Sequence, residues 1–164
     1  ICRRIAALEG KLAVLEIGGY TKGEMEEKRL RCEDALQASF AAMEEGVVSG
    51  GGLALLQCYR ALYHKSKSEN KDIQAGMNCV FHSILRPFLQ LMENNYEDPS
   101  KMLQLQLGKE ASIGYDVWSE KWCDLYDKGI VDPAKVVIQS LRNAVSVASL
   151  LIRCDVAMLT KQNQ

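Results

Sequence analysis

The chain has 164 residues, of which 48% are hydrophobic and 25% are charged, and its formal net charge is −1. This length suits one domain, or one domain with an appendage, and the composition is that of a protein with a packed core. The near-neutral charge gives no basic excess that would indicate nucleic-acid binding. The longest apolar run, residues 144–152, is shorter than the roughly 20 residues of a membrane span. We therefore expect neither a nucleic-acid partner nor a membrane partner.

Six cysteines are scattered along the chain without a Cys-x-x-Cys pair. Their spacing argues against a zinc site and is more typical of small buried hydrophobic residues in a reducing compartment. The chain begins with Ile1 rather than methionine, and no apolar segment of a secretory signal follows its first arginines. We expect the chain to be a piece of a longer protein.

The N-terminal part predicts one strong helix. Residues 1–8 could be the end of a helix, and residues 12–17 alternate in the way of a short β-strand. From Lys22 to about Glu45, apolar residues recur at helical intervals on one face, which predicts a long helix with a buried stripe. The residues of that stripe are Met25, Cys32, Leu36, Phe40 and Met43. Gly46 is typical of the residue that follows a helix end.

The C-terminal part predicts mainly helices. Residues 53–62 and 73–92 have helical apolar patterns, separated by a polar loop over 64–72, and Pro87 should kink or break the second helix. Residues 111–128 predict a small hairpin or loop. Residues 136–151 are apolar nearly all round, which predicts a central, buried helix, and residues 154–159 read as a terminal strand. The predicted fold class is mainly α with minor β, with a division near Gly46.

Two Asp-Pro pairs, Asp98-Pro99 and Asp132-Pro133, predict helix starts, each with an aspartate N-cap followed by proline. For Asp132, capping alone is one interpretation. Hydrogen bonding to a ribose is the other.

Asp34 and the glycines that follow are the most informative candidates for chemistry. Asp34 is predicted opposite the apolar stripe of its helix, either as a solvated surface residue or as an acid directed at a ligand. Gly50-Gly51-Gly52 opens the next predicted helix, either as a flexible hinge or as a place where a phosphate approaches backbone amides. Neither a Walker loop nor a Rossmann glycine motif occurs.

An aromatic segment offers a second candidate. Tyr115-Asp116 together with Trp118 and Trp122 could form a platform for a nucleotide base, although ordinary packing is the favoured interpretation for both tryptophans. An unrelated helical enzyme has little support, because no nucleophile–base pair or metal cluster is apparent.

The order of these motifs resembles group I chaperonins of the GroEL type. The resemblance covers essentially the whole chain and is most specific in Glu33-Asp34-Ala35-Leu36 combined with the triple glycine. Further similar segments are Met25-Glu26-Glu27-Lys28, Glu44-Glu45-Gly46-Val47-Val48, Ile113-Gly114-Tyr115, Gly129-Ile130-Val131-Asp132-Pro133 and Ala148-Ser149-Leu150-Leu151-Ile152.

The resemblance implies an arrangement of domains. Residues 1–45 would be an intermediate-domain segment, a short strand plus a long helix, with the end of an apical-side helix at 1–10. Residues 46–164 would be the C-terminal half of the equatorial ATP-binding domain, a helical bundle.

The resemblance also implies site residues and ligands. Asp34 would be the catalytic aspartate that orients the water attacking the γ-phosphate. Gly50 and Gly51 would contact the nucleotide through the backbone, and Asp132 would bind the ribose hydroxyls. Asp116 and Val117 replace the family's usual Asn-Ala near the adenine, a departure that alters the base pocket and is typical of a divergent paralogue. ATP would be the cofactor, with Mg and K ions held mainly by segments absent from this chain, and no metal ligand is assigned here.

Two functions remain open. The first is part of an ATP-dependent chaperonin that folds non-native proteins inside a ring; the alternative is a divergent paralogue or fragment that serves as an assembly module without ATPase activity. The implied partners are other subunits in seven-membered rings, a GroES-type co-chaperonin and unfolded clients, in the bacterial cytoplasm or an organellar matrix. Because the phosphate-binding loop and the apical domain are missing, we expect this piece alone neither to hydrolyse ATP nor to fold clients. We also expect faces that it exposes to be masked by rearrangement or self-association.

Overall fold

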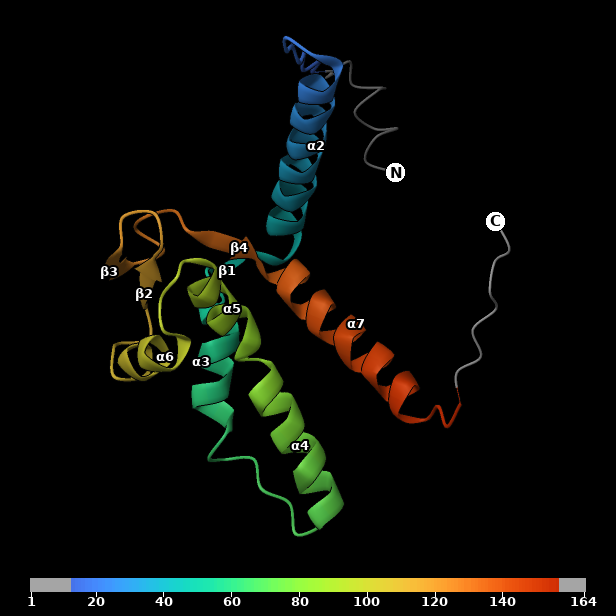
Figure 1. The fold of residues 1–164 in the computed structure, drawn as a ribbon, viewed down its shortest axis with the longest axis vertical. Coiled ribbons are helices and arrows are strands. Elements are labelled where there is room, and N and C mark those ends of the chain that lie inside the picture. Colours follow the sequence, from blue (N-terminus) through green and yellow to red (C-terminus); the bar gives the residue numbers. More distant parts are fainter. Residues whose placement is uncertain (1–12, 157–164) are drawn as a thin grey trace. The chain divides into compact units, whose positions relative to one another are not determined.

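The structure, a computed structural model, describes residues 13–156 (Figure 1). The chain divides into two compact units, Ile1–Ser39 and Phe40–Gln164, and each is described by itself. The elements in chain order are α2 (Lys22–Glu45), β1 (Val47–Ser49), α3 (Leu53–Leu62), α4 (Lys71–Ser83), α5 (Arg86–Asn94), α6 (Pro99–Leu107), β2 (Ile113–Asp116), β3 (Lys121–Asp124), β4 (Val131–Pro133) and α7 (Ala134–Ile152).

The first unit contains most of helix α2, which has the predicted bounds. Ion pairs between successive turns support it, with Lys28 Nζ 2.7 Å from Glu24 Oε1 and Arg31 Nη2 2.6 Å from Glu27 Oε1. These pairs are exposed, so each contributes little to stability. The predicted burial of the apolar stripe is wrong, because none of the residues of α2 is buried.

The strand predicted at 12–17 is also wrong over the residues that the structure describes. Residues 13–17 are irregular, and none of the described strands pairs with them. A strand needs a neighbour for its backbone hydrogen bonds, so alternation alone did not produce one. The helix end predicted at residues 1–8 lies outside the described residues.

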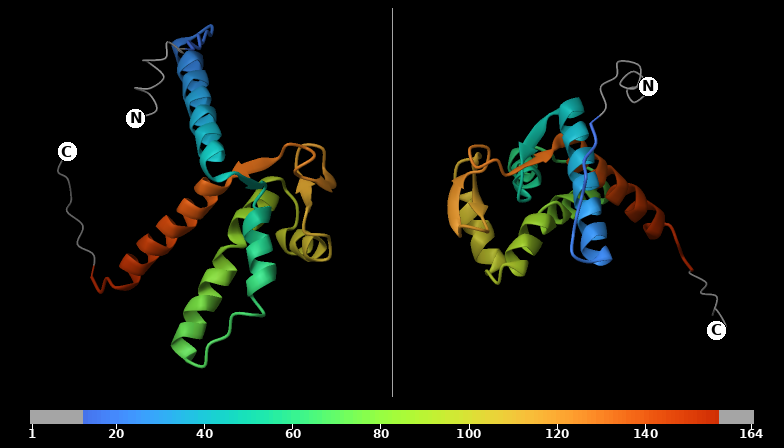
Figure 2. Two further views of the ribbon diagram at one scale, coloured as in Figure 1. Left: turned by 180° about the vertical axis from the view of Figure 1, so that it is seen from behind. Right: turned by 90° about the horizontal axis from the view of Figure 1, so that it is seen from above.

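The core of the second unit lies where α3 and α5 meet the β2–β3 hairpin and α6. Its buried members are Leu53, Leu56, Leu85, Phe88, Met92, Met102, Tyr115 and Leu125. The further views in Figure 2 show the hairpin beside α6. The long helix predicted at 73–92 is two helices, because the chain breaks at Ile84 and Leu85, just before the predicted breaker Pro87.

Two small antiparallel sheets complete the unit. In the first, β1 pairs with β4, so that Val48 lies opposite Asp132. The second is the predicted hairpin, β2 with β3, in which Tyr115 lies opposite Trp122. Gly46 ends α2 with a positive φ of 81°, as predicted, and its N–H donates to Ala42 O over 2.8 Å.

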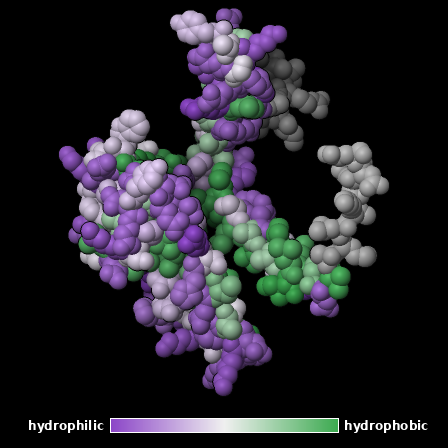
Figure 3. Space-filling model, viewed as in Figure 1, coloured by the Kyte–Doolittle hydropathy of each residue, from purple (hydrophilic) through white to green (hydrophobic). Residues whose placement is uncertain are grey.

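Helix α7 is predicted to be buried, and in this structure it is not. None of its residues is buried, and Figure 3 shows apolar surface along it. Its length and composition would also allow it to cross a membrane, properties that it shares with core helices of soluble proteins. The absence of a membrane partner therefore stays a prediction. Residues 154–156 form no strand, and the rest of the predicted terminal strand lies outside the described part.

The five cysteines that the structure describes are not fully buried, contrary to the prediction, and Cys2 lies outside the described residues. Cys58, Cys79 and Cys154 are exposed, and Cys32 and Cys123 are half-buried. The faces that carry Cys58, Cys79 and Cys154 are not covered by the residues described here, whereas Cys123 packs against the core.

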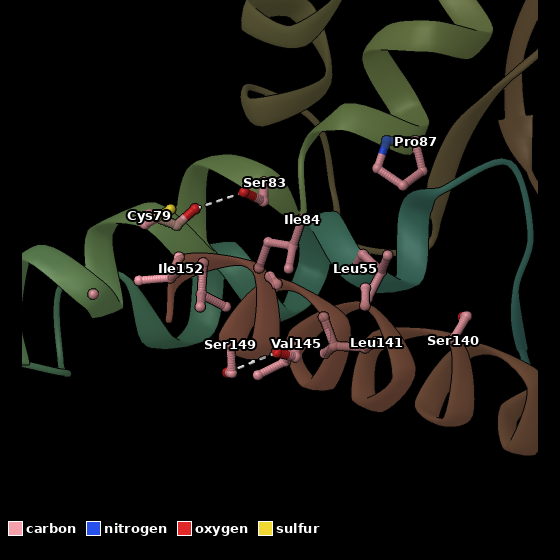
Figure 4. A pocket seen from close by; sticks show the side chains of 14 residues that line it. Leu55, Cys79, Ser83, Ile84, Pro87, Ser140, Leu141, Val145, Ser149 and Ile152 are labelled. Carbon is pink, nitrogen blue, oxygen red and sulfur yellow. Dashed lines mark hydrogen bonds between the residues drawn. The ribbon is translucent and has the colours of Figure 1, made fainter. Parts of the chain in front are cut away.

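An apolar groove of about 560 Å³ runs between α7 and the α3–α4 pair. Figure 4 shows Leu55, Ile84, Leu141 and Val145 lining it. Serines also line it, but they direct their hydroxyls to carbonyls of their own helices; Ser149 Oγ donates to Val145 O over 2.8 Å. The groove therefore presents apolar surface even where its residues are polar.

Candidate nucleotide site

The triple glycine connects β1 to α3 by a tight left-handed turn. Gly51 and Gly52 have positive φ values of 62° and 74°, a region that suits glycine. Gly52 is also crowded, since a Cβ there would lie 2.8 Å from Phe88 N. Gly50 continues the β1–β4 ladder and donates its N–H to Ile130 O over 3.0 Å. The turn and the close packing thus each require glycine at these positions, while the choice between a hinge and a phosphate contact stays open.

The three amides differ in what they can offer a ligand. The Gly50 N–H is engaged by Ile130, whereas the Gly51 and Gly52 N–H groups have no acceptor among the hydrogen bonds of the described residues. Gly51 also lines a pocket of about 630 Å³, a volume within the usual range for small-molecule sites, about 300–1,000 Å³. A glycine N–H at such a pocket is suited to donate a hydrogen bond to a phosphate oxygen at close approach.

The pocket brings together several residues that the sequence singled out. Gly51, Asp116 and Val117 all line it, although more than 60 positions separate the glycine from the other two. The remaining lining residues are Leu91, Asn95, Tyr115, Trp118 and Ile130. Leu91, Asn95 and Ile130 were missed, because a hydrophobic residue or a helix-end asparagine has no distinctive sequence signal.

Asp116 is held inside its own turn. Its Oδ2 accepts the Ser119 hydroxyl over 2.6 Å, and its Oδ1 accepts the Trp118 N–H over 3.0 Å. These bonds, the Ser119 hydroxyl first, lower the pKa of the buried Asp116 carboxyl. The carboxylate at this position therefore shapes the turn between β2 and β3.

The two tryptophans have different surroundings. Trp122 packs against the core, with its ring 5.2 Å from that of Tyr115 and the Lys109 ammonium 4.9 Å from its centroid. Packing is thus the correct interpretation for Trp122. It is wrong for Trp118, which is 97% exposed and lies in the turn that follows β2.

Asp132 is not the N-cap that the Asp-Pro pair predicts. The N-cap is Pro133, without a side-chain cap, and α7 begins at Ala134. The extended chain continues through Pro133 because the Ala134 N–H donates to Gly46 O over 3.0 Å, next to the β1–β4 ladder. Capping therefore does not explain Asp132.

Asp132 is half-buried, and burial raises the pKa of its carboxyl. Within the described residues no hydrogen bond engages its side chain. Side chains two residues apart in extended backbone point to the same side. This rule would put Asp132 on the side of Ile130, which lines the pocket, although Asp132 is not itself one of the lining residues.

Asp34 lies in the first unit, on the exposed surface of α2. The pocket belongs entirely to the second unit. The catalytic role of Asp34 consequently stays a prediction.

Across the described chain, His, Cys, Asp and Glu side chains form no group of three or more that could hold a metal ion.

Comparisons with known proteins identify the family. The sequence model of the TCP-1/cpn60 chaperonin family matches residues 3–162. The chain belongs to the TCP-1/cpn60 chaperonin family. A solved structure described as a group III chaperonin in the open state is similar, with a TM-score of 0.72 and 27% sequence identity. The match covers 87% of this chain and 30% of that one, so the chain spans under a third of the solved chaperonin.

These matches confirm the predicted fold class, mainly α with minor β and of the chaperonin type. The family model describes TCP-1/cpn60 chaperonins in general, and the matching structure is a group III chaperonin. The assignment to group I therefore stays a prediction.

Proposed function

We propose that this chain is the C-terminal part of an ATP-dependent chaperonin subunit of group I, with the nucleotide held at the pocket beside Gly51. The observation that carries the proposal is the convergence of Gly51, Asp116 and Val117 on one pocket in a chain of the chaperonin family. Residues 1–45 would serve as the intermediate-domain segment and residues 46–164 as half of the equatorial domain.

The residues present suit a nucleoside triphosphate. The Gly51 amide would donate to a phosphate oxygen, and Leu91, Val117 and Ile130 would surround the base. Asp132 would accept hydrogen bonds from the ribose hydroxyls, for which its side chain carries no competing bond among the described residues. Bound ATP with its Mg ion would supply the reactive phosphoryl group, and positioning of the attacking water is the task assigned to Asp34.

The mechanism makes hydrolysis depend on domain movement. Asp34 belongs to a different unit from the pocket, and in this proposal a movement of that unit brings the acid to the phosphate. An acid on a mobile element couples hydrolysis to closure, because water is oriented only in the closed state. Ring partners, a GroES-type co-chaperonin, unfolded clients and a location in the bacterial cytoplasm or an organellar matrix belong to this proposal.

Phosphate release in Mg and K buffer tests the proposal. The chain alone should show no turnover, whereas a subunit in which it replaces the matching C-terminal region of an active group I chaperonin should hydrolyse ATP. Asp34→Ala in that chimera should reduce turnover by at least tenfold without weakening ATP binding. Glu33→Gln is the matched control, since Glu33 is an exposed carboxylate one residue away that pairs with Arg29.

Two results would contradict parts of the proposal. Turnover by the chain alone would overturn its inactivity, and equal turnover by the Asp34→Ala and Glu33→Gln chimeras would remove the catalytic role of Asp34.

The second candidate function, an assembly module without ATPase activity, is favoured by the apolar groove beside α7. The lining of this groove is almost entirely apolar, which would be unusual for a face left in water, and α7 itself has no buried residue. A chimera that assembles into rings and binds ATP, yet never releases phosphate, would support this function over the first.

A further inference from the structure

Trp118 is an exposed aromatic residue on the wall of the candidate nucleotide pocket. It lines the pocket together with Gly51 and Val117, yet it is 97% exposed. Large aromatic side chains normally bury much of their surface, and a tryptophan left in water needs an explanation. None of the aromatic contacts found among the described residues includes Trp118.

The turn that carries Trp118 is fixed even though its side chain is not packed. Asp116 is buried, and its carboxylate accepts both the Trp118 N–H and the Ser119 hydroxyl. These two bonds hold the backbone of residues 116–119 at the edge of the β2–β3 hairpin. The indole is therefore anchored at the pocket, and the side-chain torsions of Trp118 remain available for a ligand to set.

Part of the pocket lining is apolar. Leu91, Val117 and Ile130 contribute it, while the glycine amide suited to phosphate belongs to Gly51. A ligand with an anionic end and a flat apolar end matches this division. Stacking on an indole adds affinity for any base and favours those with the larger ring system.

We propose that Trp118 stacks on the base of the bound nucleotide, closes the base end of the pocket and gives the site a preference for purines. This inference rests on the nucleotide site proposed above and adds a residue that determines the ligand class. Asp116 acts as a positioning residue, because it orients the turn without offering its carboxylate to the base.

Titration followed by NMR tests the inference, because the two tryptophans give separate indole N–H signals. The 164-residue chain is titrated at millimolar concentrations with ATP, with CTP and with tripolyphosphate, which lacks a base. ATP should shift the Trp118 indole signal and the Gly51 amide signal, whereas tripolyphosphate should shift Gly51 alone. Trp122 packs in the core and is the internal control.

Substitutions then measure the contribution of stacking. Trp118→Ala should weaken ATP binding by at least about fivefold and abolish the preference for ATP over CTP, while Trp118→Phe should retain most of both. Because the side chain is exposed, neither change should alter the circular dichroism spectrum. Tripolyphosphate binding should be unchanged in both variants.

The outcomes separate the two proposals. If ATP shifts Gly51 but Trp118→Ala binds ATP and CTP like the parent chain, stacking is refuted and the nucleotide site stands. If neither ATP nor tripolyphosphate shifts Gly51, the nucleotide site is refuted, and the stacking inference falls with it.

Discussion

Gly52→Ala should destabilise the second unit through two separable effects. The residue has a φ of 74°, and an alanine in this left-handed region costs about 1–2 kcal/mol. The new methyl group would also lie 2.8 Å from Phe88 N and 3.0 Å from Phe88 Cα. These are backbone atoms of α5 that cannot rotate away, and overpacking of this kind costs about 1–3 kcal/mol.

The expected loss in the free energy of unfolding is the sum, about 2–5 kcal/mol. For a chain of this size it corresponds to a fall in the melting temperature of about 2–4 °C per kcal/mol. Urea unfolding followed by circular dichroism measures the free energy, and a thermal scan checks the melting temperature.

Gly46→Ala is the matched control. Gly46 has a similar φ of 81°, but a Cβ there would meet no atom within 4 Å. Only the backbone cost of about 1–2 kcal/mol should appear. The smaller unfolded-state entropy of alanine affects both variants alike and cancels in the comparison. If the two variants lose equal stability, the packing of α5 against the glycine turn does not constrain this position.

Three further changes test the surroundings of the site. Ser49 Oγ is buried without a hydrogen-bond partner among the described residues, so Ser49→Ala should raise the free energy of unfolding by about 1 kcal/mol in urea titration; a loss would show that the hydroxyl has a partner. Burial raises the pKa of Asp132, so the folded chain should lose stability as pH rises from the ordinary aspartate pKa through the raised one. Asp132→Asn should remove this pH dependence in unfolding measured from pH 3 to 7, and weaken ATP binding, whereas an unchanged pH profile would contradict the burial argument. Hydrogen bonds lower the pKa of Asp116, so its stabilising effect should be present above the ordinary aspartate pKa and be lost as pH falls through the lowered one. Ser119→Ala removes the largest cause, and acid unfolding should then begin at higher pH; an identical acid midpoint would argue against the bond.

Local signals predicted the helices well. The bounds of α2 and α3 follow from apolar periodicity and from the glycines next to them. Asp98 caps α6 as predicted, because its carboxylate accepts the Ser100 N–H within the same few residues. Interactions between near neighbours in sequence are sufficient for such features.

The same kind of signal failed where a distant segment decides the outcome. Asp132-Pro133 has the same pattern as Asp98-Pro99, yet it continues a strand because β1 pairs with it. Residues 13–17 alternate but find no strand partner in the described part of the chain. Whether α7 is covered likewise depends on what packs on it rather than on its own sequence.

For the site, the sequence by itself determined the residue types: a glycine turn before a helix, an acid on α2 and an aromatic segment at 115–122. Only the tertiary structure decided that Gly51 and Trp118 share one pocket, that the Gly50 amide is engaged by Ile130 and that the Asp116 carboxylate is turned into its own loop. The physical reason is that side-chain type and local backbone preference are encoded within a few residues. The partner of each polar group is set by contacts between segments far apart in the chain.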